Sequence, residues 1–219
     1  MRILELFSGT GSVGKVAKKL GYEVISLDID DYNGKFIPTH KEDIMTWNYK
    51  QYDKDYFDTL WASPPCVYYS ALQRSWYGIK KKDGSIFTKE KHQKLMEIAD
   101  SWVLKVFEII EYFNLKNWYI ENPRTGALKE RQFMDFIPYI DVDYCRYCDW
   151  GYRKQTRVWT NTYSKGLVCN GDCGNIKKPG DLTNKKHKTG HRINLSRDIH
   201  KLDRYRIPPK LIESFFRQM

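Results

Sequence analysis

RILELFSGTGSVG, residues 2–14, sets the kind of fold to expect. Its first six residues are mostly apolar and predict a buried strand. Its glycines have the Gly-x-Gly-x-x-Gly spacing of a tight turn, and residues 13–20 have the apolar spacing of a helix. This order is typical of cofactor binding, because glycines let a ligand approach the backbone and the helix N-terminus offers free amide donors. The turn alone does not distinguish NAD from S-adenosylmethionine (AdoMet), and a tight turn without a ligand is the alternative.

The rest of the chain continues this pattern of strands and helices. Residues 89–113 carry apolar side chains at helical spacing, which predicts a long amphipathic helix. Further strands are expected at residues 23–27, 58–62, 117–120, 142–148 and 156–160. Because strands alternate with helices, we expect an α/β fold with a Rossmann-like, doubly wound parallel sheet. Ligands bind such sheets at the carboxyl ends of the strands.

The net charge of +10 lies in the last third of the chain. Residues 1–144 contain 20 Lys and Arg against 21 Asp and Glu, whereas residues 145–219 contain 17 against 6. An excess of this size on one part of a chain favours a polyanionic partner, most simply nucleic acid. We expect a cofactor-binding catalytic domain at residues 1–161, a small basic insertion at 162–204 and a segment at 205–219 that returns to the first domain.

Cysteine number and hydropathy limit the location of the protein. Five cysteines, an odd number in a Lys-rich chain, do not resemble the disulfide framework of a secreted protein. No run of about 18 apolar residues is present, which argues against a membrane span. We expect a monomer without a signal peptide, cytoplasmic or associated with a nucleoid or nucleus, and not secreted.

Four short motifs follow one another in the order of a known family. They are Glu5-Leu-Phe-Ser-Gly-Thr-Gly11, Ser63-Pro-Pro-Cys66, Glu121-Asn-Pro123 and Arg153-x-x-x-Arg157. In this the chain resembles the DNA (cytosine-5) methyltransferase family from residue 1 to about residue 161. The resemblance implies the class I AdoMet-dependent methyltransferase fold and methyl transfer from AdoMet to carbon 5 of cytosine in DNA. Only about 45 residues separate Trp159 from Tyr205, so the chain is a short form with a reduced target-recognition region.

The resemblance assigns three catalytic residues. Cys66 would be the nucleophile, because a thiolate that adds to carbon 6 of cytosine makes carbon 5 able to attack a methyl group. Glu121 would protonate or hydrogen-bond ring nitrogen 3, and Asn122 would help to fix the loop. Arg157 would hold the carbonyl oxygen of cytosine. From the residues alone, the alternative for Cys66 is a small buried hydrophobe, and for Glu121 and Arg157 a surface charge, although Pro-Pro-Cys at the end of a strand favours the nucleophile.

The resemblance also assigns the cofactor site. Asp28, at the end of the second strand, would bind the ribose of AdoMet, Ile29 would cover the adenine and Asp43 would take the adenine amine. Without the family, Asp43 would be interpreted as a solvated loop acid. The full set of expected cofactor-binding residues is Phe7, Ser8, Gly9, Gly11, Asp28, Ile29, Asp43 and Ile44.

Two pairs of cysteines have spacings close to those of zinc sites. Cys145, Cys148, Cys169 and Cys173 could bind a structural zinc ion, with a histidine (His187 or His191) in place of one of them. Four reduced cysteines without a metal are the alternative.

The loop after Cys66 mixes aromatic and basic residues, which suits base stacking and phosphate contacts. A base inside a duplex cannot reach Cys66, so the substrate would be double-stranded DNA with a flipped base or single-stranded DNA. Three other functions remain open on sequence grounds. These are an amino-methyltransferase, which also uses a Ser-Pro-Pro loop, a catalytically silent nucleic-acid-binding module and an NAD oxidoreductase.

Overall fold

The computed structural model describes residues 1–80, 82–176 and 202–218. These residues form a seven-stranded sheet in the order β3-β2-β1-β4-β5-β7-β6. The strands are β1 Arg2–Leu6, β2 Glu23–Asp28, β3 His40–Lys41, β4 Thr59–Ala62, β5 Asn117–Pro123, β6 Tyr139–Asp143 and β7 Gln155–Thr160. β7 runs antiparallel to both of its neighbours, whereas β1 to β5 pair in parallel. The expected Rossmann-like sheet is confirmed, but it is mixed and not wholly parallel.

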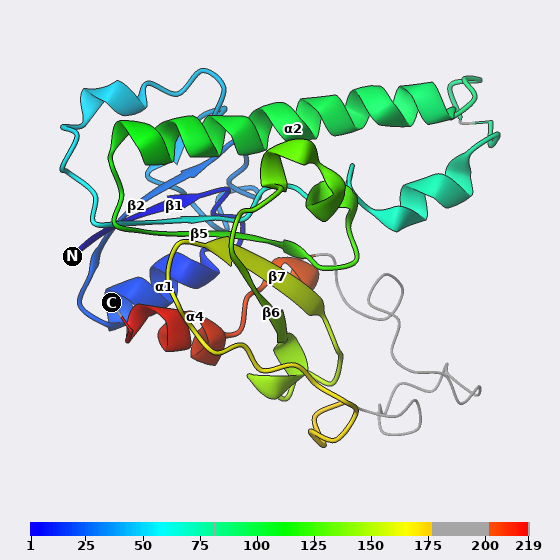
Figure 1. Cartoon of the computed structure of the whole chain (residues 1–219). Coiled ribbons are helices and arrows are strands. Elements are labelled where there is room, and N and C mark those ends of the chain that lie inside the picture. The colour runs from blue at the N-terminus through cyan, green and yellow to red at the C-terminus, as the bar shows by residue number, and fades with distance from the viewer. Residues whose placement is uncertain (81, 177–201, 219) are drawn as a thin grey trace.

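Helices cover both faces of the sheet. The long helix α2 (Lys89–Tyr112) lies on one face, and α1 (Ser12–Lys19) and α4 (Pro209–Phe216) lie together on the other (Figure 1). The described chain also has short 3-10 helices: η1 Tyr49–Gln51, η2 Ala71–Trp76, η3 Ala127–Glu130, η4 Gln132–Met134, η5 Tyr144–Arg146 and η7 Asp203–Tyr205. None of the helices in the described ranges is long and apolar enough to cross a membrane.

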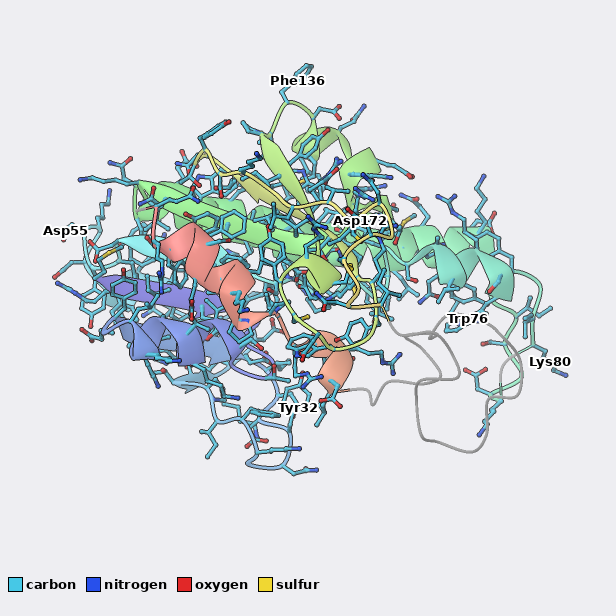
Figure 2. The ribbon with its side chains drawn as sticks, turned by 90° about the horizontal axis from the view of Figure 1, so that it is seen from below. Tyr32, Asp55, Trp76, Lys80, Phe136 and Asp172 are labelled. Carbon is cyan, nitrogen blue, oxygen red and sulfur yellow. The ribbon has the colours of Figure 1, made fainter. Side chains whose placement is uncertain are left out.

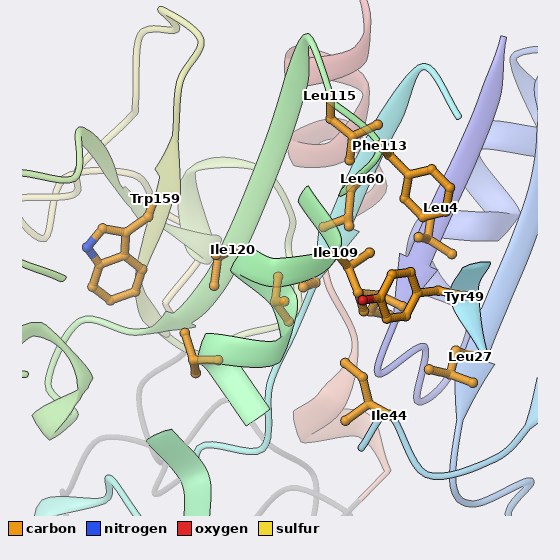
Figure 3. Close-up of a cluster of buried hydrophobic side chains, with 14 of the residues drawn as sticks. Leu4, Leu27, Ile44, Tyr49, Leu60, Ile109, Phe113, Leu115, Ile120 and Trp159 are labelled. Atoms are coloured by element: carbon orange, nitrogen blue, oxygen red, sulfur yellow. The ribbon is translucent and has the colours of Figure 1, made fainter. Parts of the chain in front are cut away.

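Alternating side chains of the central strands divide the core into two layers. Leu60 of β4 and Ile120 of β5 point toward α2, into the cluster shown in Figure 3. Their neighbours Trp61 and Tyr119 point to the other face, where they contact Phe215 of α4. All four side chains of the strands are essentially inaccessible to water. Burial on both faces is the expected environment for the central strands of a doubly wound sheet.

Two details of the sheet differ from the sequence-based expectation. The strand expected at residues 142–148 is β6, which begins earlier, at Tyr139, and ends at Asp143; the chain then turns into η5. β6 takes its position from pairing with β7, where Tyr139 lies opposite Trp159 and Asp143 opposite Gln155. The two-residue strand β3 is an addition to the expected strands, because a pair of residues carries no periodic pattern.

The division into residues 1–161, 162–204 and 205–219 stays a prediction. Residues 177–201 of the basic insertion lie outside the described residues, and with them His187 and His191. In the C-terminal segment, Leu211, Ile212 and Phe215 of α4 are buried in the same cluster as Val13 and Val16 of α1.

Candidate active site

The glycine-rich turn joins β1 to α1 at the carboxyl edge of the sheet. Phe7, Gly9 and Gly11 all have left-handed backbone angles, with φ of 55°, 52° and 65°. Glu5 of β1 points under the turn and accepts hydrogen bonds from the backbone amides of Val13 (3.2 Å) and Gly14 (3.0 Å). The first turn of α1 is therefore held by a buried side chain of the preceding strand.

Gly14 and Glu5 depend on each other. A Cβ atom at position 14 would lie 2.6 Å from Oε2 of Glu5, which explains why the last glycine of the turn has no side chain. Burial raises the pKa of Glu5 to about 7, although its two backbone hydrogen bonds act in the opposite direction. Glu5 is thus a structural acid of the turn, a role that the sequence does not reveal.

Asp28 connects the end of β2 to the same turn. One carboxylate oxygen accepts a hydrogen bond from the amide of Gly9 (2.7 Å), and the other accepts one from the amide of Asp30 (2.9 Å). Burial raises the pKa of this carboxyl group. Each oxygen of a carboxylate has two lone pairs, so both can still accept a hydroxyl donor from a ligand. The next side chain, Ile29, is 66% exposed and free to cover an aromatic ring.

The two other residues expected at the cofactor behave differently from each other. Asp43 is exposed in the segment after β3, and its carboxylate accepts the amide of Met45 at 2.9 Å. Ile44 is buried in the core cluster with Leu27, so it anchors the segment that carries Asp43 to the core.

Cys66 lies in the loop that leaves β4. Asn122 of β5 fixes this loop, because its side-chain amide donates a hydrogen bond to the carbonyl oxygen of Pro64 (2.9 Å). This is the loop contact expected from the sequence. Burial raises the pKa of the Cys66 thiol, and the charge of Glu121 adds to this effect, whereas Lys154 and, less strongly, Arg204 oppose it.

Glu121 lies near the carboxyl end of β5 and is buried, and its charge acts on the Cys66 thiol. Its Oε1 accepts a hydrogen bond from the hydroxyl of Tyr144 (3.1 Å) and is 3.7 Å from the ammonium of Lys154. The carboxyl end of the sheet therefore brings together a thiol, a carboxylate and an ammonium group. Such a set can supply a nucleophile and a proton donor or acceptor within one small volume.

Arg157 does not join this group. In β7 it lies opposite Asn122, and its guanidinium donates to both oxygens of Asp141 of β6, at 2.8 and 3.0 Å. It also lies over the ring of Tyr139, 3.4 Å from the centroid. Glu121 lies opposite Val158, and side chains alternate along a strand, so Arg157 projects from the other face of the sheet. Its assignment to the cytosine carbonyl is untested and stays a prediction.

The sequence reasoning missed Lys154 and Tyr144. Both contact Glu121, yet Tyr144 belongs to none of the motifs, and Lys154 is an unassigned position within Arg153-x-x-x-Arg157. The signal that could have found Lys154 is the alternation of β7. Residues 154, 156 and 158 share the side of Glu121, because each is an odd number of positions away from Arg157.

Comparison with known proteins places this geometry in a family. No protein-family model matches the chain. The chain is 35% identical over 225 residues to the "Probable DNA (cytosine-5)-methyltransferase" of Frog virus 3 (isolate Goorha), and the match covers 97% of both chains. The chain belongs to the DNA (cytosine-5)-methyltransferase family. The resemblance seen in the sequence motifs is thereby confirmed.

A solved methyltransferase structure shares the fold of this family member. The Entamoeba histolytica methyltransferase EhMeth matches with a TM-score of 0.51 at 19% identity, covering 77% of this chain and 55% of that one. A mutant of the Spodoptera frugiperda protein DNMT2 matches with a TM-score of 0.44 at 16% identity, covering 77% of this chain and 53% of that one. The chain spans about half the length of these structures. Its sheet and helices are those of a class I AdoMet-dependent methyltransferase.

Three of the four cysteines expected to bind metal come together in this methyltransferase. The sulfur atoms of Cys145, Cys169 and Cys173 all lie within 4.8 Å of one another. The amide of Gly171 donates a hydrogen bond to Sγ of Cys169 at 3.2 Å. Cys148 is not part of this group: its thiol donates to the carbonyl oxygen of Tyr144 at 3.2 Å. Cys145 lies within η5, whereas Cys148 follows this turn.

The loop after Cys66 extends from the same edge of the sheet. Figure 2 shows Trp76 and Lys80 of this loop at the end of the molecule opposite Asp55, which precedes β4. The loop is anchored by the buried His92 of α2, whose ring nitrogens contact the hydroxyl of Tyr77 (2.7 Å) and the carbonyl oxygen of Tyr68 (2.8 Å). The side chain of Trp76 is 47% exposed beyond this anchor.

Proposed function

We propose that the chain transfers a methyl group from AdoMet to carbon 5 of cytosine in DNA, through a covalent adduct on Cys66. The observation that carries the proposal is the loop of Cys66, which Asn122, the residue after Glu121, fixes to the carboxyl end of β5, so that the charge of Glu121 acts on the thiol. The name of the Frog virus 3 relative supports the same activity.

In the proposed reaction Cys66 is the nucleophile and Glu121 acts on nitrogen 3 of the cytosine ring. The Cys66 thiolate adds to carbon 6 of the cytosine while Glu121 supplies a proton or hydrogen bond to nitrogen 3. Carbon 5 then attacks the methyl group, and S-adenosylhomocysteine leaves. Loss of the proton from carbon 5 to a base and of the sulfur from carbon 6, with return of the nitrogen 3 proton to Glu121, restores the aromatic ring and the thiolate.

The residues at the ends of β1, β2 and β3 fit AdoMet, which supplies the electrophilic methyl group when bound. Asp28 retains lone pairs for the ribose hydroxyls, and Ile29 presents an exposed apolar side chain beside it. Gly9 and Gly11 have left-handed backbone angles and no side chains, so a ligand can approach the backbone of the turn. We assign cofactor binding to Phe7, Ser8, Gly9, Gly11, Asp28, Ile29 and Asp43, with Ile44 as their buried support.

The substrate is DNA in which the target cytosine is unpaired, either flipped out of a duplex or in a single strand. A half-buried Cys66 within the loop cannot reach a base that stays stacked. The exposed Trp76 and Lys80 extend from the same loop, where an aromatic ring can fill the place of a displaced base and an ammonium can contact phosphate.

The proposal also includes a structural zinc ion held by Cys145, Cys169 and Cys173. Three sulfur atoms close enough to share one ion fit the preference of zinc for thiolates. Such an ion would tie the segment around Cys169 and Cys173 to η5, directly after β6.

The covalent mechanism is tested with DNA that contains 5-fluorocytosine. Fluorine cannot leave carbon 5 as a proton does, so the enzyme is expected to stay bound to the DNA as an adduct stable in denaturing gels. The Cys66→Ala variant should give no adduct and no 5-methylcytosine by nucleoside mass spectrometry, whereas Cys148→Ala, a substitution at another half-buried cysteine, should give both. Methylation of DNA by the wild type without a trapped adduct would instead support an amino-methyltransferase.

A further inference from the structure

The ammonium group of Lys154 is fixed at the point where three segments meet. Lys154 directly precedes β7, and its carbonyl oxygen accepts the amide of Tyr144 at 3.1 Å. Its Nζ is 3.7 Å from Oε1 of Glu121 of β5, 4.8 Å from the centroid of the Tyr144 ring and 3.4 Å from the carbonyl oxygen of Arg204 of η7, to which it donates. The side chain is only 15% exposed. An ordinary surface lysine has no such set of partners.

The charges around Cys66 explain why a cation is needed there. The charged groups that act on the thiol are Glu121 from β5, Lys154 from the start of β7 and Arg204 from η7. Lys154 lies 3.7 Å from Glu121, and the next residue of β5, Asn122, holds the loop of Cys66 through the carbonyl oxygen of Pro64. Burial and the carboxylate of Glu121 both disfavour a thiolate, and they raise the pKa of Cys66. Among the opposing charges, Lys154 has the larger effect and Arg204 the smaller. A thiolate next to a carboxylate, away from water, thus depends on a nearby positive charge.

The alternative cation is engaged elsewhere. Arg157 is bound by both oxygens of Asp141 and projects from the opposite face of β7. The strand therefore offers Lys154, and not Arg157, to the side of the sheet where Glu121 lies.

We infer that Lys154 is a positioning residue of the catalytic site, whose ammonium stabilises the Cys66 thiolate and holds the carboxylate of Glu121 in place. The inference rests on the proposed function of Cys66 as nucleophile. It assigns the positive charge of the site to a residue outside the motif arginines.

The test is the pH dependence of Cys66 alkylation by iodoacetamide, followed by peptide mass spectrometry so that the other four cysteines do not interfere. In Lys154→Met the alkylation profile should move to higher pH by about one unit, so that Cys66 reacts about tenfold more slowly at pH 7. Lys154→Arg keeps the charge and should restore most of the rate. Lys154→Gln gives a second neutral variant that can still donate to the carbonyl of Arg204 if Lys154→Met does not fold.

Lys105→Met is the matched control. Lys105 of α2 is 18% exposed and lies 2.6 Å from Glu108, so it is a comparably buried lysine with a carboxylate partner away from the site. Its loss should leave the alkylation profile of Cys66 unchanged. An unchanged profile in folded Lys154→Met or Lys154→Gln would overturn the inference. Alkylation requires neither DNA nor AdoMet, so this result is independent of whether the chain methylates DNA.

Discussion

At the scale of single residues, Asp28 has a structural role in the glycine-rich turn and an assigned role in cofactor binding. Its carboxylate holds the amides of Gly9 and Asp30, and it is assigned to the ribose of AdoMet. Asp28→Ala should weaken AdoMet binding by about 1–3 kcal/mol, the usual effect of losing a charged hydrogen-bond partner. Calorimetric titration measures the change.

The control for this experiment is Asp31→Ala. Asp31 is close in sequence but pairs with Lys41 at 2.8 Å. Its loss should leave AdoMet affinity within error of the wild type. Equal affinity in Asp28→Ala and the wild type would remove Asp28 from the binding site.

The residues of the site divide into those that sequence motifs can identify and those that only pairing reveals. Cys66 and Glu121 follow or end short buried strands, so their motifs by themselves point to one edge of the sheet. Lys154 could not be found in this way. The side of β7 on which a residue projects depends on its register with β5, and a shift of one residue exchanges the two faces. Arg157 and Lys154 lie an odd number of residues apart.

At the scale of secondary structure, the β1–turn–α1 unit could be predicted almost to the residue, because its apolar run and glycines are local signals. Its dependence on Glu5 could not, since a carboxylate inside a strand gives no sign of which amides it accepts. This buried acid makes a prediction about pH. The pKa of Glu5 is about 7 in the folded protein against 4.5 for the free group, so folding favours the protonated form.

The contribution of Glu5 to stability should therefore be complete below about pH 4.5 and lost as pH rises through about 7. The full difference corresponds to about 3 kcal/mol of unfolding free energy. Urea unfolding between pH 5 and 8 should show this fall in the wild type and a flatter curve in Glu5→Gln, which stays neutral. Glu111→Gln, an exposed position on α2, is the control and should follow the wild type. Parallel curves for Glu5→Gln and the wild type would contradict the prediction.

The cysteine cluster is a second element whose spacing was informative only in part. The spacings of both cysteine pairs indicated a zinc site, but of the first pair only Cys145, which lies within η5, joins Cys169 and Cys173. Spacing alone does not reveal this. If zinc is bound, the purified protein should contain about one equivalent. Cys169→Ser should then lose the metal and melt at least about 5 °C lower.

Cys148→Ser serves as the control for the zinc experiment, because its thiol contacts a backbone carbonyl and not the other sulfur atoms. It should retain the zinc content of the wild type. Background metal in wild-type protein prepared without chelators would show that the three thiols are unliganded.

At the scale of the whole molecule, the sheet order joins segments far apart in the sequence. β7 inserts between β5 and β6 and runs antiparallel to both, which brings residue 154 to Glu121. No local pattern predicts this, because both neighbours are reached through irregular connections and pairing direction leaves no trace in a single strand. Charge, in contrast, is readable directly: residues 145–219 carry almost three times as many basic as acidic residues.

This distribution of charge predicts how the protein selects its target. Each specific base contact contributes only about 1–3 kcal/mol of discrimination, so reading a long site needs many fixed side chains. Residues 160–204 are few and strongly basic, which equips them for phosphates more than for base edges. We expect a target of few bases with loose flanks and binding that weakens steeply with salt. Bisulfite sequencing of treated DNA shows the target directly.

Replacing lysines within the basic insertion and lysines elsewhere on the protein tests whether the insertion binds phosphates or reads bases. Replacing Lys185, Lys186 and Lys188 with Ala should weaken DNA binding and reduce the slope of log affinity against log salt by up to about 3, one for each lost phosphate contact. The preferred sequence should not change. Replacing Lys18, Lys19 and Lys116, which are exposed at the end of α1 and just before β5, should leave the slope as it is. A long, strictly observed recognition sequence that shifts in the first triple variant would show that the basic region reads bases.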